Sequence, residues 1–198
     1  RLAGSEIHDV LLITGAFGGF GKVWAEWLAD RGARQRVLAG RSGAVTPEAE
    51  EFITKLRQRG VNVQVVRADV GSTDDVQRLL AEIATAGHPL KGVFHLAMVI
   101  DDAPLAALTR ERMRAVLAPK AQGAWLLHEN TLGLDLDCFV LFSSVSSVFG
   151  SPAQGNYAAA SAFLDALAHH RHALGLPALA INWGALGGGG YVGGNEGV

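Results

Sequence analysis

Short apolar segments alternate with helical segments along the chain, and this alternation restricts the fold more than any other feature. The predicted strands, rich in Val, Ile and Leu, cover residues 10–14, 36–40, 61–68, 92–96, 138–143 and 178–183. Because these segments are apolar along their whole length, they need a parallel sheet covered by helices on both faces and joined by right-handed crossovers. The sequence therefore predicts an α/β fold, a doubly wound Rossmann-type parallel sheet flanked by helices.

Helix starts lie between these strands. Residues 19–30 carry apolar side chains at helical spacing, Thr46-Pro47-Glu48 is typical of a capped helix start, and Ser72 precedes another periodic stretch.

A length of 198 residues favours one domain, residues 1–198, rather than two. The glycine-rich residues 186–198 are expected to begin a flexible substrate lid that is truncated here.

Composition argues against several classes of protein. The chain is 49% hydrophobic and 18% charged with a net charge of -2, so no global attraction to nucleic acid or to an anionic membrane is expected. We find neither a leader nor an apolar run near the roughly 20 residues of a membrane span. Cys138, the single cysteine, cannot form an internal disulfide, which favours a cytoplasmic location. His169, His170 and His172 lack the further ligands of a metal site, so no metal is predicted.

A glycine-rich segment follows the first predicted strand and opens the first predicted helix. In that setting glycines allow the backbone to approach a pyrophosphate, whose charge meets the free N–H groups of a helix start. A plain glycine-rich turn is the alternative. The residues predicted to bind a dinucleotide here are Thr14, Gly15, Phe17, Gly18, Gly19, Phe20 and Gly21.

Other candidate cofactor contacts follow later strands. After the second strand, Arg41 and Ser42 occupy the place where folds that prefer NAD usually carry an acid, so a 2′-phosphate and hence NADPH are favoured. Alternatively, Arg41 is an ordinary solvated arginine. Asp69 and Val70 are expected to contact the adenine, and His95 and Ala97 are expected to lie at the cofactor ribose. Alternatively, each pair merely ends a strand.

Ser144 and Tyr157 place two hydroxyl groups at the end of a strand and the start of a helix. Two neutral hydroxyls at this edge suit a reaction in which a carbonyl oxygen is held, polarised and protonated. A tyrosine needs a nearby ammonium group to give up a proton near neutral pH. Short-chain dehydrogenases usually carry this lysine four residues after the tyrosine, where Ser161 stands here, so the lysine must come from elsewhere in the chain.

At this point the chain closely resembles the ketoreductase domains of modular and iterative polyketide synthases. The resemblance runs nearly end to end. Its matching segments are residues 14–21, 40–42, 68–70, 92–97, 100–102, 119–120, 123–125, 142–144, 150–151, 154, 156–160, 163–167 and 183–184.

The resemblance implies an enzyme that uses NADPH to reduce a β-ketoacyl thioester on an acyl carrier protein to a β-hydroxyacyl thioester. Tyr157 would donate the proton, Ser144 would hold the carbonyl oxygen, and Lys120 would lower the pKa of the phenol and help bind the ribose. Ser161 occupies the position where the family is expected to carry an asparagine. The expected partners are the carrier protein and other synthase domains, including an upstream structural subdomain.

The resemblance also implies a stereochemical course. Ile100-Asp101-Asp102 is similar to the Leu-Asp-Asp motif of B-type ketoreductases, which give the D-configured β-hydroxyl, and Phe149 replaces the tryptophan that marks A-type domains. Gln154 belongs to the same group of expected substrate contacts. An N-terminal cap on the helix that follows is the alternative role for Asp101 and Asp102, and the two roles are compatible.

Two other functions stay open. The chain could be a catalytically impaired structural module, because Ser161 replaces the expected asparagine and Met98 replaces the glycine that the family usually has after the alanine. It could also be a free-standing short-chain dehydrogenase. The missing lysine at position 161 argues against that alternative.

Overall fold

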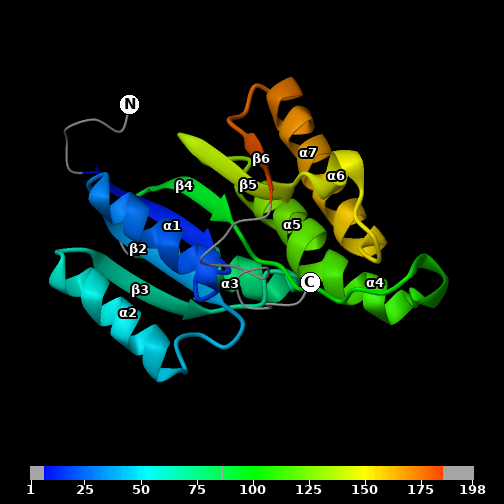
Figure 1. Cartoon of the computed structure of the whole chain (residues 1–198). Helices are drawn as coiled ribbons and strands as arrows, with labels where there is room; N and C mark the ends of the chain where they lie inside the picture. The colour runs from blue at the N-terminus through cyan, green and yellow to red at the C-terminus, as the bar shows by residue number, and fades with distance from the viewer. Residues whose placement is uncertain (1–6, 86, 185–198) are drawn as a thin grey trace.

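The computed structural model describes residues 7–85 and 87–184. It contains a 6-stranded parallel sheet in the order β3-β2-β1-β4-β5-β6, seen in Figure 1. The strands are β1 (Ile7–Thr14), β2 (Ala33–Gly40), β3 (Asn62–Arg67), β4 (Leu90–His95), β5 (Cys138–Ser144) and β6 (Leu179–Trp183). The predicted doubly wound Rossmann-type sheet is therefore confirmed. Strand β2 begins earlier than predicted, because the polar side chains of Arg34 and Gln35 hide its first residues from an apolar pattern.

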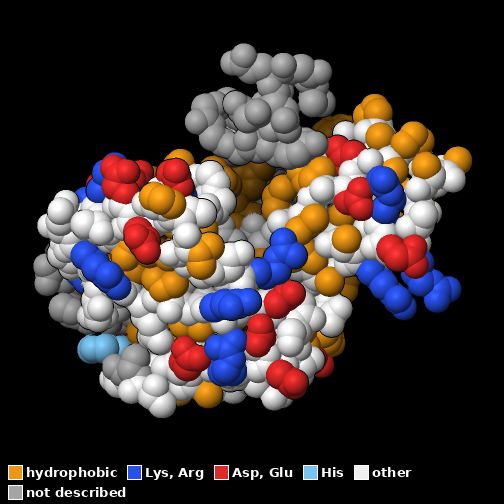
Figure 2. All heavy atoms as spheres, turned by 90° about the horizontal axis from the view of Figure 1, so that it is seen from below, with side chains coloured by type: hydrophobic (Ala, Val, Ile, Leu, Met, Phe, Trp, Pro, Cys, Tyr) orange, Lys and Arg blue, Asp and Glu red, His pale blue; other side chains and the backbone are white. Residues whose placement is uncertain are grey.

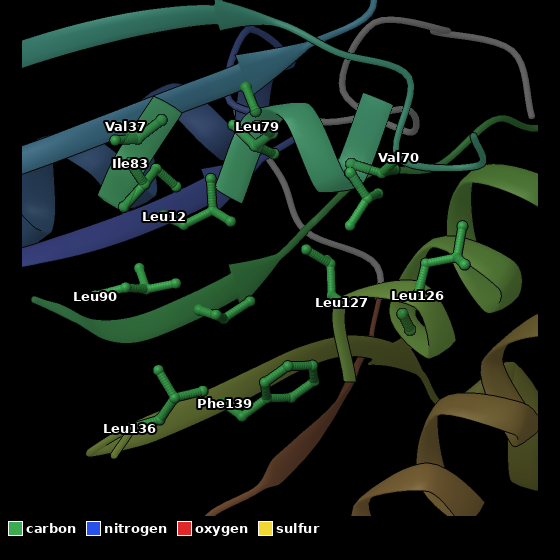
Figure 3. Packing of buried hydrophobic residues seen from close by; sticks show 14 of the residues in the cluster. Leu12, Val37, Val70, Leu79, Ile83, Leu90, Leu126, Leu127, Leu136 and Phe139 are labelled. Carbon is green, nitrogen blue, oxygen red and sulfur yellow. The ribbon is translucent and has the colours of Figure 1, made fainter. Parts of the chain in front are cut away.

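Helices cover both faces of the sheet. Their bounds are α1 (Gly19–Asp30), α2 (Pro47–Gln58), α3 (Thr73–Thr85), η1 (Leu105–Ala107), α4 (Arg110–Leu117), η2 (Ala118–Gln122), α5 (Gly123–Asn130), α6 (Ser146–Phe149) and α7 (Gly155–Ala173). Helices α1 and α2 pack on one face, where Leu28 and Phe52 join the apolar side chains of the strands. Helices α3, α5 and α7 pack on the other face, and Figure 3 shows Leu79, Leu127 and Leu12 among the buried side chains there.

The predicted start of α2 is confirmed in detail. The Thr46 hydroxyl oxygen accepts a hydrogen bond of 3.2 Å from the backbone N–H of Ala49, and Pro47 occupies the first turn. Glu48 and Glu50 add negative charge to the same turn, which favours the positive end of the helix dipole. Local sequence alone thus fixes where this helix begins.

The sheet order changes direction between β1 and β4. At this point Thr14 pairs in register with Ala39 on β2 and with His95 on β4, so the carboxyl ends of three strands lie side by side. Ligands of open α/β sheets bind at such a point. Figure 2 shows a face of the molecule on which hydrophobic side chains border a hollow. The predicted lid, residues 186–198, lies outside the described residues.

The described residues offer neither a membrane span nor a metal site. Among them, no helix combines the length and the apolar character that crossing a membrane requires. The same residues contain no group of three or more His, Cys, Asp or Glu side chains that could hold a metal ion.

Candidate active site

The loop between β1 and α1 brings backbone against backbone at two glycines. Gly15 has a φ of +67°, and a Cβ there would lie 2.7 Å from the amide nitrogen of Ala97. A Cβ on Gly21 would lie 2.7 Å from the carbonyl oxygen of Ala16. Helix α1 begins after Gly18 without a side-chain cap and without an acidic residue in its first turn. This helix start can therefore receive an anion such as a pyrophosphate.

The other residues of the loop divide into a buried support and an exposed tip. Thr14 is fully buried at the end of β1. The Phe17 ring covers Gly40, whose Cβ, if present, would lie 2.9 Å from Phe17 Cδ2. The Phe20 ring packs edge-on against Phe142 with 5.3 Å between centroids. The exposed residues are Gly18 and Gly19. Backbone rather than side chains is thus presented at the tip.

The candidate contacts with the adenine end of the cofactor have different exposures. Arg41 and Ser42 are exposed directly after β2, so their side chains can reach a ligand. One Asp69 carboxylate oxygen accepts a hydrogen bond of 2.9 Å from the N–H of Gly71 and closes the turn after β3. Val70 is buried in the core. The side chain of Val70 is therefore unavailable to an adenine, and a contact of its backbone with the adenine stays a prediction.

Ser144 and Tyr157 lie at the carboxyl edge of the sheet, at the end of β5 and in the first turn of α7. Ser144 Oγ accepts hydrogen bonds from the backbone N–H of Ser146 at 3.2 Å and from its hydroxyl at 3.0 Å. Burial raises the pKa of the Tyr157 phenol, and the neighbouring Ser144 hydroxyl opposes this rise. A raised pKa keeps the phenol protonated at neutral pH, as a proton donor requires.

The ammonium group of Lys120 lies inside the protein against the ring of Tyr157. Its side chain is 1% exposed, Nζ donates a hydrogen bond of 3.0 Å to the carbonyl oxygen of Phe142, and Nζ lies 4.2 Å from the centre of the Tyr157 ring. Burial lowers the pKa of Lys120 to about 7, while the Asp165 carboxylate acts in the opposite direction. The structure therefore brings together the lysine and tyrosine that the sequence separates.

Lowering of the phenol pKa by Lys120 stays a prediction. Burial is the largest influence on Tyr157 and raises its pKa. Lys120 is itself so buried that its charge is costly to maintain, and Nζ faces the ring. Stabilisation of the phenolate by this ammonium thus competes with desolvation of both groups.

His95 occupies a buried position at the end of β4. Its ring is 1% exposed, with Nδ1 2.8 Å from the Thr14 hydroxyl oxygen and Nε2 2.9 Å from the carbonyl oxygen of Lys120. We predicted a contact between His95 and the cofactor ribose. Since both ring nitrogens are bonded inside the protein, the side chain is not available for that contact. Ala97 does border the glycine loop at Gly15.

Asp101 and Asp102 connect the loop after β4 to two helices. Arg112 Nη1 donates to Asp101 Oδ1 at 2.8 Å, and Gln154 Nε2 donates to Asp102 Oδ2 at 2.9 Å. The short helix η1 has Pro104 as its N-cap and no side-chain cap hydrogen bond. The cap interpretation is therefore wrong, because the carboxylates point to α4 and to the start of α7 instead.

Large apolar side chains are exposed beside these residues. Phe149, at the end of α6, is 86% exposed, and Leu105 is 83% exposed. Leu105 Cδ1 lies 3.8 Å from the position of a Cβ on Gly155, the first residue of α7. Both side chains are thus open to contact with an apolar ligand.

This arrangement agrees with what the chain is similar to. A family model described as "KR domain" matches residues 10–188. The chain belongs to the KR domain family. A solved structure titled "Structure of A-type Ketoreductases from Modular Polyketide Synthase" is 46% identical with a TM-score of 0.89, covering 94% of this chain and 39% of that one. "The first ketoreductase of the tylosin PKS" is 42% identical with a TM-score of 0.86, covering 98% and 42%.

Curated relatives of this KR domain are far longer proteins. The "Phenolphthiocerol synthesis polyketide synthase type I Pks15/1" of Mycobacterium marinum is 48% identical over 92% of this chain and 9% of its own length. The "Polyketide synthase GfsB" of Streptomyces halstedii is 47% identical over 88% of this chain and 3% of its own length. The chain thus spans less than a tenth of each.

Two residues of this KR domain depart from the expected family pattern. Ser161 is fully buried one turn after Tyr157, and its Oγ has no hydrogen-bond partner. Its carbonyl oxygen accepts from the Ser143 hydroxyl at 3.0 Å. Met98 Sδ lies 3.9 Å from the Tyr157 hydroxyl oxygen. Of the two, Met98 contacts the phenol directly.

Sequence reasoning missed two supporting asparagines. Asn156 is fully buried, where Nδ2 donates to the Asp101 carbonyl at 2.8 Å and Oδ1 accepts from the Tyr157 N–H at 2.9 Å. Its position directly before the tyrosine was the available signal. Asn182 Nδ2 donates to Asp165 Oδ2 at 2.9 Å. No local pattern marks Asn182, since it meets this carboxylate only when β6 pairs with β5.

Proposed function

We propose that the chain reduces the ketone of a β-ketoacyl thioester, carried on an acyl carrier protein, to a β-hydroxyacyl thioester with NADPH. The observation that carries this proposal is the buried ammonium of Lys120, 4.2 Å from the centre of the Tyr157 ring. Burying a lysine ammonium group costs free energy of folding, so such a group is a candidate for a functional role. Beside a phenol, it can stabilise the phenolate that forms when the phenol gives its proton to a carbonyl oxygen.

The glycine loop fits the cofactor. The close approach of Gly15 to Ala97, together with the uncapped start of α1, supports binding of the pyrophosphate there. Exposed Arg41 and Ser42 suit a 2′-phosphate and so favour NADPH over NADH. When bound, this cofactor supplies the hydride.

The residues of the chain supply the proton and hold the substrate. The Ser144 hydroxyl donates a hydrogen bond to the substrate carbonyl oxygen, which polarises the carbonyl group. Tyr157 gives its proton to the same oxygen as negative charge develops there. Lys120 stabilises the phenolate that remains, and the proposed further member of the proton relay is the hydroxyl of Ser161.

The proposed setting is a polyketide synthase. Relatives named as polyketide synthases support a carrier protein and other synthase domains as partners, including an upstream structural subdomain. The cytoplasmic location predicted from Cys138 belongs to the same proposal. The exposed Phe149 and Leu105 side chains suit an apolar acyl chain.

We further propose a D-configured product. Asp101 and Asp102 occupy the B-type positions, and Asp102 is held by Gln154 beside the start of α7. Two similar solved structures are titled as A-type ketoreductases, so the assignment depends on this local motif rather than on overall similarity. Chiral separation of the β-hydroxyacyl product decides it, and an L-configured product would refute the B-type assignment.

The activity is tested by mixing the purified chain with NADPH and a β-ketoacyl thioester and following NADPH oxidation. We expect turnover by the wild type, slower turnover with NADH, and loss of turnover in Tyr157→Phe with NADPH binding retained. If the folded wild type binds NADPH yet never oxidises it with any β-ketoacyl thioester, the proposal is wrong.

A catalytically impaired structural module is the second candidate, and specific contacts favour it. Ser161 Oγ has no partner, and Met98 Sδ lies 3.9 Å from the phenol oxygen, where a substrate carbonyl would need room. This candidate predicts NADPH binding without turnover. Gain of activity in Ser161→Asn or Met98→Gly would identify the departure responsible.

A further inference from the structure

His95 links the phosphate loop to the lysine of the active site. We propose that His95 is a positioning residue, which holds the backbone of Lys120 so that its ammonium group stays against Tyr157. The inference rests on the proposed function, since it assigns a role in the same proton transfer. His95 is not a catalytic residue in this proposal, because it touches neither the phenol nor the ammonium group.

The hydrogen bonds of His95 define one tautomer. A backbone carbonyl oxygen can only accept, so the 2.9 Å contact between Nε2 and the Lys120 carbonyl requires a proton on Nε2. Nδ1 then carries the lone pair and accepts from the Thr14 hydroxyl at 2.8 Å. Of the two neutral tautomers, only the one with the proton on Nε2 satisfies both contacts.

The backbone that His95 holds has an unusual conformation. Lys120 lies in the π-helical turn η2, between α4 and α5. Such single turns are rare and often occur at functional sites. The turn directs the lysine side chain inward, where Nζ reaches the Phe142 carbonyl and the Tyr157 ring. The carbonyl contact with His95 anchors this turn to the end of β4 from its other side.

The position of the imidazole is itself fixed. Thr14 and His95 are register partners on β1 and β4, so the sheet sets their separation. On the other side, a Cβ on Gly123 would lie 3.2 Å from His95 Cε1, so glycine leaves the ring its place. Charge agrees with this role. Burial lowers the pKa of His95 to about 4, and the neighbouring ammonium of Lys120 also disfavours an imidazolium.

Two substitutions separate the two hydrogen bonds. In His95→Gln the side-chain amide can reach the Lys120 carbonyl as Nε2–H does, whereas in His95→Asn the shorter amide reaches only Thr14. We expect kcat to fall about ten- to a hundredfold in His95→Asn, as for other small misplacements of catalytic groups, and much less in His95→Gln. The alkaline limb of the kcat profile should move to higher pH in His95→Asn only, because a displaced ammonium stabilises the phenolate less.

His128→Asn is the matched control. His128 is a second buried histidine, on α5, and its Nδ1 lies 3.0 Å from Arg171 Nη1. We expect this variant to lose stability without a shift of the pH profile. Equal pH profiles for wild type, His95→Asn and His95→Gln would overturn the proposal. A wild type without turnover would instead count against the proposed function itself.

A measurement on the unmodified chain covers the case in which His95→Asn does not fold. Nitrogen-15 NMR of the histidine rings, assigned by the missing signal of His95→Gln, reports which ring nitrogen carries the proton. We expect the neutral tautomer with the proton on Nε2 throughout the pH range of activity. The Nδ1–H tautomer, or an imidazolium in that range, would overturn the proposal.

Discussion

Replacing Lys120 by methionine should make the protein more stable while it abolishes the proposed activity. Lys120 is 1% exposed, and burial lowers its pKa from 10.5 to about 7. The folded state therefore holds the protonated amine less well than the unfolded chain does. Methionine has a similar length and no charge, so it removes this unfavourable term without opening a large cavity.

The expected gain follows from opposing contributions. A pKa lowered from 10.5 to about 7 corresponds to roughly 4 kcal/mol against the folded state at neutral pH. Methionine forfeits the Nζ hydrogen bond to Phe142, worth about 1 kcal/mol, and the contact of Nζ with the Tyr157 ring, worth about 1 kcal/mol. The net gain should be about 2 kcal/mol near pH 7.

Urea denaturation as a function of pH tests this directly. Between about pH 7 and 10.5 the amine of Lys120 is protonated in the unfolded chain but mostly neutral in the folded one. The contribution of Lys120 to wild-type stability should therefore rise with pH across that window and be smallest below it. Subtracting the unfolding free energy of Lys120→Met from that of the wild type at each pH cancels the contributions of all other titrating groups. Lys91→Met is the control, since an ion pair with Asp135 raises the pKa of Lys91. A less stable Lys120→Met at every pH, or a difference independent of pH, would refute the reasoning.

Other perturbations have equally definite outcomes. Gly15→Ala should weaken NADPH binding in a fluorescence titration and cost more than 1 kcal/mol of stability, because it meets the Ala97 backbone. Gly175→Ala, with a φ of +72° and nothing within 4 Å, should cost only about 1 kcal/mol and leave binding unchanged. Stability contributed by neutral His95 should be present above pH 6.5 and lost as pH falls towards about 4, and pH-independent acid denaturation would contradict this. Cys138 is half-buried, and burial raises its pKa to about 11, so it should react with thiol reagents much more slowly in the folded chain than after unfolding. Equal rates of modification before and after unfolding would contradict this.

Local patterns in the sequence predicted the layers of the fold and the edge of the sheet that carries the site. Apolar runs and helical periods act locally, so they predicted all six strands and the cap of α2 at Thr46. The position of Ser144 and Tyr157 at a strand end and a helix start followed from the same local patterns. Similarity of whole segments added Lys120, which no spacing rule could select.

Which groups each candidate side chain contacts depends on how distant parts of the chain pack together. Hydrogen bonds such as those of His95 with Thr14 and Lys120 join residues far apart in the chain, and they form only when parallel strands set the register. Val70 and Asp101 show the same limit, because burial and ion pairing depend on packed neighbours rather than on adjacent residues. The pKa values of Lys120 and Tyr157 depend on the folded interior in particular. Desolvation shifts both values, and these side chains lose their contact with water only when the chain folds.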